Sequence, residues 1–196
     1  MPSCLECFCE SGFSGQHLQK LIDSIHPAFV CELDKCSSFS PGPVDNAETI
    51  GFILIDPLHY DQERSTVVPE AFRELTTRDL STIRVKHALQ QEADTTRQDL
   101  IERGTQRIPP KLRFVDEVCI ATVADIRSTI LDGTRLFAVY DTGLETAPAH
   151  ASIFTRGDVL ADRRLRKVVR NRIHEIFTRS RIKYAEFRGM LSEKAA

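Results

Sequence analysis

Five of the six cysteines fall within the first 36 residues, at Cys4, Cys7, Cys9, Cys31 and Cys36. The N-terminal stretch has neither the basic start nor the apolar run of a secretory signal, so we expect a cytoplasmic location. Thiols are kept reduced there, which disfavours a disulfide framework and makes metal binding the better explanation of the cluster. The cysteines therefore predict a small metal-binding module over residues 1–44.

The predicted metal ligands are Cys4, Cys7, Cys31 and Cys36, which would hold one structural zinc ion. Cys4 and Cys7 have the C-x2-C spacing of a zinc knuckle, and the second pair has a wider C-x4-C spacing. Four thiolates complete a tetrahedral shell and leave no open position for water. The zinc would therefore stabilise the fold rather than take part in catalysis.

Other interpretations of the cysteines stay open at this point. An iron–sulfur cluster could use the same thiolates, or the thiols could be unliganded. Cys9 or His26 could also replace one of the four zinc ligands. Cys119 lies in an apolar run, which favours a small buried side chain rather than a nucleophile.

Turn-forming residues dominate positions 37–43 and place a boundary near residue 45, so residues 45–196 are expected to form the main domain. Short apolar β runs are expected at 51–55, 81–85, 117–123 and 135–140, with an edge strand at 152–154. Helical segments are expected at 88–103 and 124–131. The pattern predicts an α+β or α/β chain in which a zinc module precedes a mixed sheet domain. The strand, helix, strand order suits a crossover unit, and an antiparallel arrangement stays open as the alternative because the intervening helix is short.

The last predicted element is a long basic amphipathic helix that starts from Asp158 as its N-cap. Residues 156–188 hold 11 Lys/Arg against 4 Asp/Glu, whereas residues 1–155 hold 14 against 23. The basic side chains singled out as a binding face are Arg163, Arg164, Arg166, Lys167 and Arg170.

Such a face suits contacts with nucleic-acid phosphates, because guanidinium groups pair bidentately with phosphate oxygens. An acidic protein partner is a second possibility, and a solvated face that balances the acidic remainder of the chain is a third. Few aromatic residues accompany the basic ones, so base-specific recognition is not predicted.

A second group of polar residues lies at the ends of the apolar β runs and consists of His59, Ser81, Arg84 and His150. Together they could supply a base, a nucleophile and an anion clamp in one cleft. Each also has an ordinary structural explanation, as a packed histidine, a turn serine or an ion-paired arginine. Phosphate-loop, dinucleotide-binding, serine-hydrolase and zinc-protease motifs are missing, which disfavours those common enzyme classes.

No apolar stretch approaches the roughly 20 residues of a membrane span, so we expect no membrane partner.

Two resemblances are visible in these motifs. The ordered set His59, Pro69-Glu70-Ala71-Phe72, Asp79-Leu80-Ser81 with Arg84, and Pro148-Ala149-His150-Ala151 is similar to the pattern of an uncharacterised bacterial family, which implies a bacterial origin and no particular activity. The front end, Cys4 to Cys7 with Phe8 followed by Cys31 and Cys36, resembles zinc-binding leaders of bacterial RES-type toxins, which degrade NAD. Those leaders close with a tighter second pair, and the resemblance carries over no catalytic residue.

The first functional hypothesis is therefore a zinc-stabilised bacterial binding protein that engages nucleic acid or an acidic partner, in defence or mobile-element biology. The alternative is an enzyme, a transferase or hydrolase of a nucleotide-like substrate, with His59, Ser81, Arg84 and His150 around one cleft. A structural adaptor is a third hypothesis. The oligomeric state is not predicted.

Overall fold

A six-stranded antiparallel sheet forms the centre of the molecule in a computed structural model that describes residues 3–9, 16–25 and 29–193. The strand order is β10-β5-β1-β4-β9-β8, and each neighbouring pair is antiparallel. The strands are β1 (Thr49–Ile53), β4 (Leu80–Arg84), β5 (Glu117–Thr122), β8 (Phe137–Asp141), β9 (His150–Thr155) and β10 (Arg181–Lys183). The fold is a mixed α+β fold.

One face of the sheet carries the largest apolar core, which is covered by helix α6 (Arg163–Phe177) and the 3-10 segment η2 (Pro69–Thr76). Phe72 of η2 stacks on Phe177 of α6 with ring centroids 5.7 Å apart. Phe52 of β1 joins them, 4.9 Å from the ring of Phe72. Three aromatic rings from distant parts of the chain thus fix η2 and α6 to the same strands.

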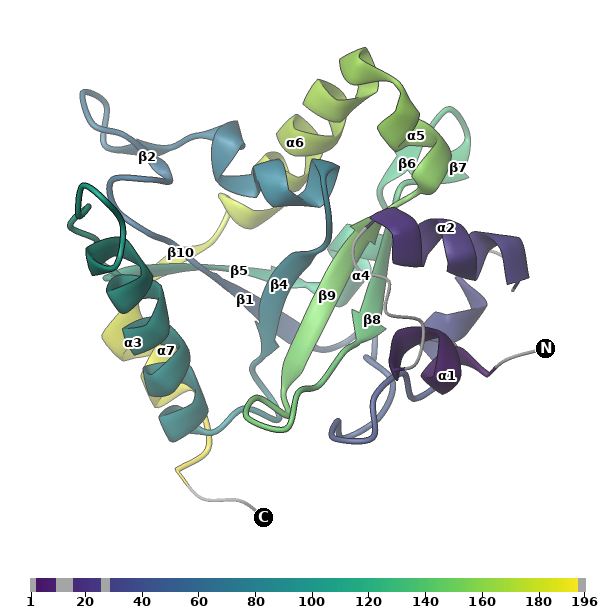
Figure 1. Cartoon of the computed structure of the whole chain (residues 1–196), viewed down its shortest axis with the longest axis horizontal. Coiled ribbons are helices and arrows are strands. Elements are labelled where there is room, and N and C mark those ends of the chain that lie inside the picture. The colour runs from purple at the N-terminus through teal and green to yellow at the C-terminus, as the bar shows by residue number, and fades with distance from the viewer. Residues whose placement is uncertain (1–2, 10–15, 26–28, 194–196) are drawn as a thin grey trace.

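The opposite face is covered by two separate groups of helices (Figure 1). Helices α3 (Gln90–Thr105) and α7 (Tyr184–Gly189) lie over the end of the sheet that holds β10, β5 and β1. Close packing here requires a glycine at position 51, because a Cβ on Gly51 would lie 2.6 Å from Cε2 of Phe187. The N-terminal elements α1 (Cys4–Cys9), α2 (Gln16–Ile25) and η1 (Val30–Leu33) lie at the other end, against β8 and β9.

The N-terminal elements share a core with the sheet. Cys4, Cys31 and Ile22 belong to the same buried cluster as Tyr140 of β8 and Phe154 of β9. The segment is therefore packed directly on the sheet, and the boundary near residue 45 stays a prediction. The described part of the chain contains no helix with the length and apolar character needed to cross a membrane.

Several sequence predictions need correction. The helix at 124–131 is the shorter α4 (Val123–Arg127), and the strands on either side of it, β5 and β8, are not neighbours, because β1, β4 and β9 lie between them in the sheet. Strand β9 was expected at an edge but lies between β4 and β8. Both differences arise because strand pairing depends on contacts between distant segments, which short apolar runs do not encode.

The predicted start of the basic helix is also wrong. Asp158 belongs to a separate short helix, α5 (Gly157–Ala161), and its carboxylate accepts a hydrogen bond from Arg156. The N-cap of α6 is Asp162, whose side chain accepts a hydrogen bond from the backbone N–H of Arg164 at 2.7 Å. Helix α6 is followed by β10 and α7, so it is not the last element of the chain.

Two short hairpins complete the fold, β2 (Tyr60–Asp61) with β3 (Thr66–Val67) and β6 (Ile130–Leu131) with β7 (Thr134–Arg135).

Candidate functional sites

The predicted zinc site is wrong. Cys4 and Cys31 form a disulfide with a Cα–Cα distance of 5.5 Å, so their sulfur atoms are not thiolates. Burial raises the pKa of the Cys36 thiol, and this disfavours the thiolate that a metal would need. The ranges described by the structure contain no group of three or more His, Cys, Asp or Glu residues placed to hold a metal ion.

The four cysteines nevertheless lie in one buried cluster, as their clustering in the sequence indicated. The error came from assuming a reducing compartment, which removed the disulfide from consideration. Cys7 and Cys36 are buried beside the disulfide, and the thiol of Cys36 lies 3.1 Å from the carbonyl oxygen of Cys31. The two other ligand candidates were His26, which lies outside the described residues, and Cys9, whose side chain is not described.

The four residues of the predicted cleft lie in three places. His59 packs on Phe52, with ring centroids 5.4 Å apart, on the side of the sheet that η2 and α6 cover. Arg84 is buried in an ion-pair cluster with Glu48 and Asp141. Ser81 and His150 are the only two of the four that come together. They lie on the opposite side of the sheet as diagonal neighbours, because Ser81 pairs with residue 152 across the β4–β9 ladder.

His59 is a neutral packing residue in this structure. Its Nδ1 accepts a hydrogen bond from the backbone N–H of Ile55 at 3.1 Å, and its side chain is buried. Burial, together with the nearby cations Arg113 and Arg73, lowers the pKa of His59 to about 4. A histidine with this pKa does not carry a proton at neutral pH.

This low pKa predicts a pH-dependent loss of stability. An unfolded histidine takes up a proton near pH 6.5 and the folded one near pH 4, so the unfolded state binds more protons between these values. The free energy of unfolding should fall as the pH is lowered through this window, by roughly 2.5 kcal/mol between pH 7 and 4.5 from this residue alone. Urea unfolding at about pH 7 and about pH 4.5 measures this fall in the free energy of unfolding. The His59→Gln variant, which has no titrating group, should lack that part of the pH dependence, and an unchanged dependence would contradict the assignment.

His150 belongs to a chain of hydrogen bonds on the face of the sheet opposite η2 and α6. Its Nδ1 lies 3.1 Å from the carbonyl oxygen and 2.9 Å from the Oγ1 of Thr142. Thr142 Oγ1 donates to Ser152 Oγ at 2.8 Å, and Ser152 Oγ donates to Asp79 Oδ2 at 2.6 Å. Sequence analysis singled out His150 but not the hydroxyl groups that link it to a carboxylate.

The carbonyl of Thr142 fixes the tautomer of His150. A carbonyl oxygen only accepts, so the proton of the neutral imidazole is on Nδ1 and the lone pair is on Nε2. Burial lowers the pKa of His150, although the hydrogen bond to Thr142 opposes this. Nε2 makes no hydrogen bond to any residue that the structure describes. A neutral imidazole held in this way can accept a proton at Nε2.

The basic side chains of α6 form the most strongly charged face. Arg163, Arg164 and Lys167 are exposed, and Arg166 and Arg170 are half-buried. Arg166 donates through Nε to the carbonyl oxygen of Leu160 at 2.8 Å, which ties α6 to α5. None of the five forms an ion pair with a carboxylate among the described residues.

No known family, curated protein or solved structure matches this chain. Its function has to be inferred from its own geometry.

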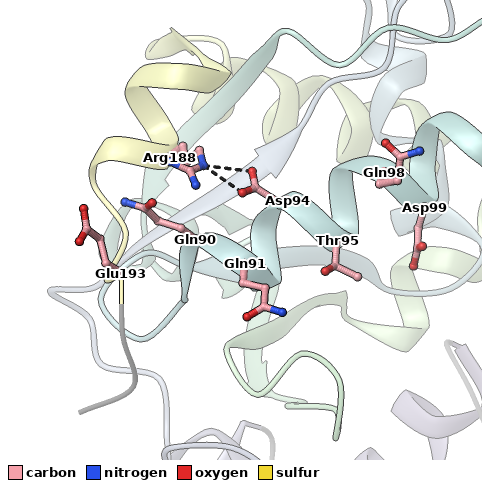
Figure 2. A pocket seen from close by; sticks show the side chains of 8 residues that line it. All are labelled: Gln90, Gln91, Asp94, Thr95, Gln98, Asp99, Arg188 and Glu193. Atoms are coloured by element: carbon pink, nitrogen blue, oxygen red, sulfur yellow. Dashed lines mark hydrogen bonds and ion pairs between the residues drawn. The ribbon is translucent and has the colours of Figure 1, made fainter.

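Among the hollows on the described surface, two are lined by clusters of charged side chains, and neither of these contains a predicted site residue. The larger, of about 460 Å³, runs along α3 beside α7 and is lined by polar residues (Figure 2). Arg188 of α7 points at Asp94 of α3 and donates to both carboxylate oxygens, at 2.9 and 3.2 Å. The lining residues are Gln90, Gln91, Asp94, Thr95, Gln98, Asp99, Arg188 and Glu193. This ion pair joins α3 to α7, and no cysteine, serine or histidine is among the lining residues.

The second hollow, of about 260 Å³, lies beside β10 and centres on Glu117. The carboxylate of Glu117 accepts a hydrogen bond from Tyr60 Oη at 2.7 Å and pairs with Lys183 at 2.8 Å and with Arg181 at 3.3 Å. These partners lower the pKa of Glu117 despite its burial. The sequence offered no signal for this cluster, because Tyr60 and Lys183 are 57 and 66 residues from Glu117 in the chain. The carboxylate of Glu117 is engaged by Tyr60, Arg181 and Lys183, so this cluster holds β10 on β5.

Proposed function

We propose that the chain binds polyanions, and nucleic-acid phosphates in particular, through the first half of helix α6. The observation that carries the proposal is the exposed set Arg163, Arg164 and Lys167, supported by Arg170, because no carboxylate among the described residues forms an ion pair with any of them. The first turn of α6 contains no acidic residue that would neutralise them.

The position of these cations in the helix also supports a binding role. The N-terminus of a helix carries a partial positive charge, so cations in the first turn are electrostatically unfavourable there by a few tenths of a kcal/mol each. Asp162 satisfies the N-cap but lies at the helix end, away from Lys167 and Arg170. An external anion would relieve this repulsion, since each phosphate replaces the missing counter-charge.

The spacing of the cations suits a phosphate backbone. Arg163, Lys167 and Arg170 are at positions i, i+4 and i+7 and therefore lie along one side of the helix over about 10 Å. Buried Val169, Ile173 and Phe177 fix α6 on the sheet, while Arg163 and Lys167 are exposed and Arg170 is half-buried beside the buried residues. A rigid row of cations can follow two or three successive phosphates without reading bases.

Salt dependence tests the proposal directly. Three phosphate contacts predict a slope of about −2.7 for log K against log salt on duplex DNA, which is a loss of roughly 40-fold in affinity between 50 and 200 mM salt. The triple reversal Arg163→Glu, Arg164→Glu and Lys167→Glu should remove both the binding and its slope. Fluorescence anisotropy with labelled 30-nucleotide single-stranded RNA, single-stranded DNA and duplex DNA measures the three affinities.

The matched control reverses three exposed cations outside α6, Lys35, Arg64 and Lys86, and changes the net charge by the same amount. This control should retain most of the affinity. The proposal would be wrong if no binding occurred at 50 mM salt, or if both triple variants lost the same affinity.

The alternative of an enzyme with one shared cleft receives less support. His59 and Arg84 lie apart from Ser81 and His150, and Arg84 has all its donors engaged internally. The structural-adaptor hypothesis has no distinguishing observation in its favour.

A further inference from the structure

A second basic surface lies at the far end of α3 and in the loop that follows it. Residues 103–115 contain four basic side chains, Arg103, Arg107, Lys111 and Arg113, and no acidic one. The first three are exposed, and none of the four pairs with a carboxylate in the part of the chain that the structure covers. We call residues 103–114 the basic–apolar loop. It is separate in sequence from α6.

The same loop exposes large apolar side chains. Ile108 is 100% exposed, Leu112 is 66% exposed and Phe114 is 48% exposed. Isolated exposed apolar residues need no explanation, but three within seven residues, interleaved with cations, form a patch of distinct chemistry. Leu58, also exposed, lies in the segment that begins at Asp56, and Asp56 pairs through its backbone with Phe114.

The loop is held in place rather than free. The backbone N–H of Lys111 donates to the carbonyl oxygen of Gly104 at 2.9 Å, which folds the loop back on the end of α3. Arg113 is buried against Gly104 and donates to the carbonyl oxygen of Leu100 at 3.0 Å. A Cβ on Gly104 would lie 2.4 Å from the carbonyl oxygen of Lys111, so the packing requires glycine. The apolar side chains are thus presented on a fixed support, which lowers the entropic cost of docking.

We propose that the basic–apolar loop docks on an anionic lipid surface, with Ile108 and Leu112 entering the headgroup region and Arg103, Arg107 and Lys111 contacting lipid phosphates. The charge of the loop is complementary to such a surface. Its most exposed side chains are aliphatic, which favours insertion into lipid over stacking on nucleic-acid bases. A protein bound in this way lies on the membrane surface and needs no membrane-crossing helix.

The two kinds of side chain contribute different parts of the binding. Each cation near an anionic leaflet strengthens partitioning roughly fivefold, so three of them give on the order of 100-fold, and this part depends on salt. Insertion of the aliphatic side chains adds a part that salt does not screen. Binding should therefore need anionic lipid and also depend on Ile108 and Leu112.

A tryptophan probe tests the proposal, because the natural chain contains no tryptophan. In the full-length Ile108→Trp variant, emission should shift to shorter wavelength on addition of vesicles of 70% phosphatidylcholine and 30% phosphatidylglycerol, and brominated lipid should quench it. Vesicles of phosphatidylcholine alone should give no shift. The matched control is Leu33→Trp, at a 79% exposed leucine of the N-terminal segment, and its emission should not change.

Vesicle co-sedimentation separates the contribution of the loop cations from that of the aliphatic side chains. The α6 reversal tests whether the basic face of α6 takes part in lipid binding. The reversal Arg103→Glu, Arg107→Glu and Lys111→Glu should lower partitioning by about 100-fold or more. Ile108→Ser with Leu112→Ser should also weaken it, without any change in charge. The α6 reversal should leave the Ile108→Trp shift in place. The proposal would be overturned if the shift required α6, if the serine variant sedimented as the wild type does, or if the loop reversal abolished nucleic-acid binding and left lipid binding unchanged.

Discussion

Replacing Arg84 with alanine is expected to lower the free energy of unfolding by about 3 to 5 kcal/mol, because it leaves two buried carboxylates without their cation. Arg84 is 1% exposed, and its partners Glu48 and Asp141 are buried as well. Its Nε donates to Glu48 Oε2 at 2.8 Å and its Nη2 to Glu48 Oε1 at 2.7 Å, a bidentate pair. Its Nη1 lies 3.3 Å from Asp141 Oδ1.

The remaining contacts of Arg84 hold the segment that links the N-terminal elements to the sheet. Nη1 donates to the carbonyl oxygen of Gly42 at 2.6 Å, and Nη2 donates to that of Pro43 at 3.1 Å. Burial alone would raise the pKa of Glu48, but the hydrogen bonds from Arg84 keep it below its ordinary value. Arg84 therefore joins β4, β8 and this linking segment.

Two further variants separate charge from geometry at Arg84. Arg84→Lys keeps the charge but cannot form the planar bidentate contact, so it should lose a substantial part of the stability. The triple variant Arg84→Met, Glu48→Gln and Asp141→Asn removes every charge and should be more stable than Arg84→Met alone. Urea unfolding midpoints, with an unchanged m-value, measure the differences. A loss below 1 kcal/mol for Arg84→Ala would show that the cluster is not the internal anchor described here.

The sequence was informative about local structure. Apolar runs at 51–55, 81–85 and 117–123 each fall on a strand, displaced by one or two residues, and the expected helix at 88–103 is α3. These elements follow from the periodicity of apolar residues, which is a local property. Strand order, the extra strand β10 and the break between α5 and α6 depend on distant contacts, and sequence reasoning missed all three.

The candidate sites were less predictable because their chemistry depends on partners. An arginine beside an apolar run can clamp a ligand or neutralise a buried carboxylate, and only the position of Glu48, 36 residues away, distinguishes the two. The basic residues of α6 were identifiable from charge alone, but the absence of ion pairs between them and the described carboxylates was not. The loop around Ile108 passed unnoticed, since exposure of apolar side chains in a turn-rich segment leaves no periodic pattern.

Glu32 is the second residue whose loss should be severe, since it closes an open edge of the sheet. Strand β8 is at the end of the sheet, so its outward backbone groups have no strand partner. The carboxylate of Glu32 accepts from the backbone N–H of Val139, and Arg127 donates to the carbonyl oxygen of Val139 at 3.1 Å. Arg127 and Arg135 both pair with the buried carboxylate. One acidic side chain from the N-terminal segment thus substitutes for a neighbouring strand.

Glu32→Ala should therefore cost about 3 kcal/mol or more, because it removes the carboxylate that pairs with two arginines and leaves the backbone N–H of Val139 without its acceptor. Urea unfolding measures the loss, and hydrogen exchange should show faster exchange of the Val139 amide. An uncovered strand edge also promotes association, so light scattering should rise with protein concentration. The control is Glu145→Ala, an exposed carboxylate in the β8–β9 loop, which should leave all three readouts unchanged. If Val139 stayed protected in Glu32→Ala, another group would have to cover the edge, and the N-terminal segment would owe its position to the disulfide and the apolar core alone.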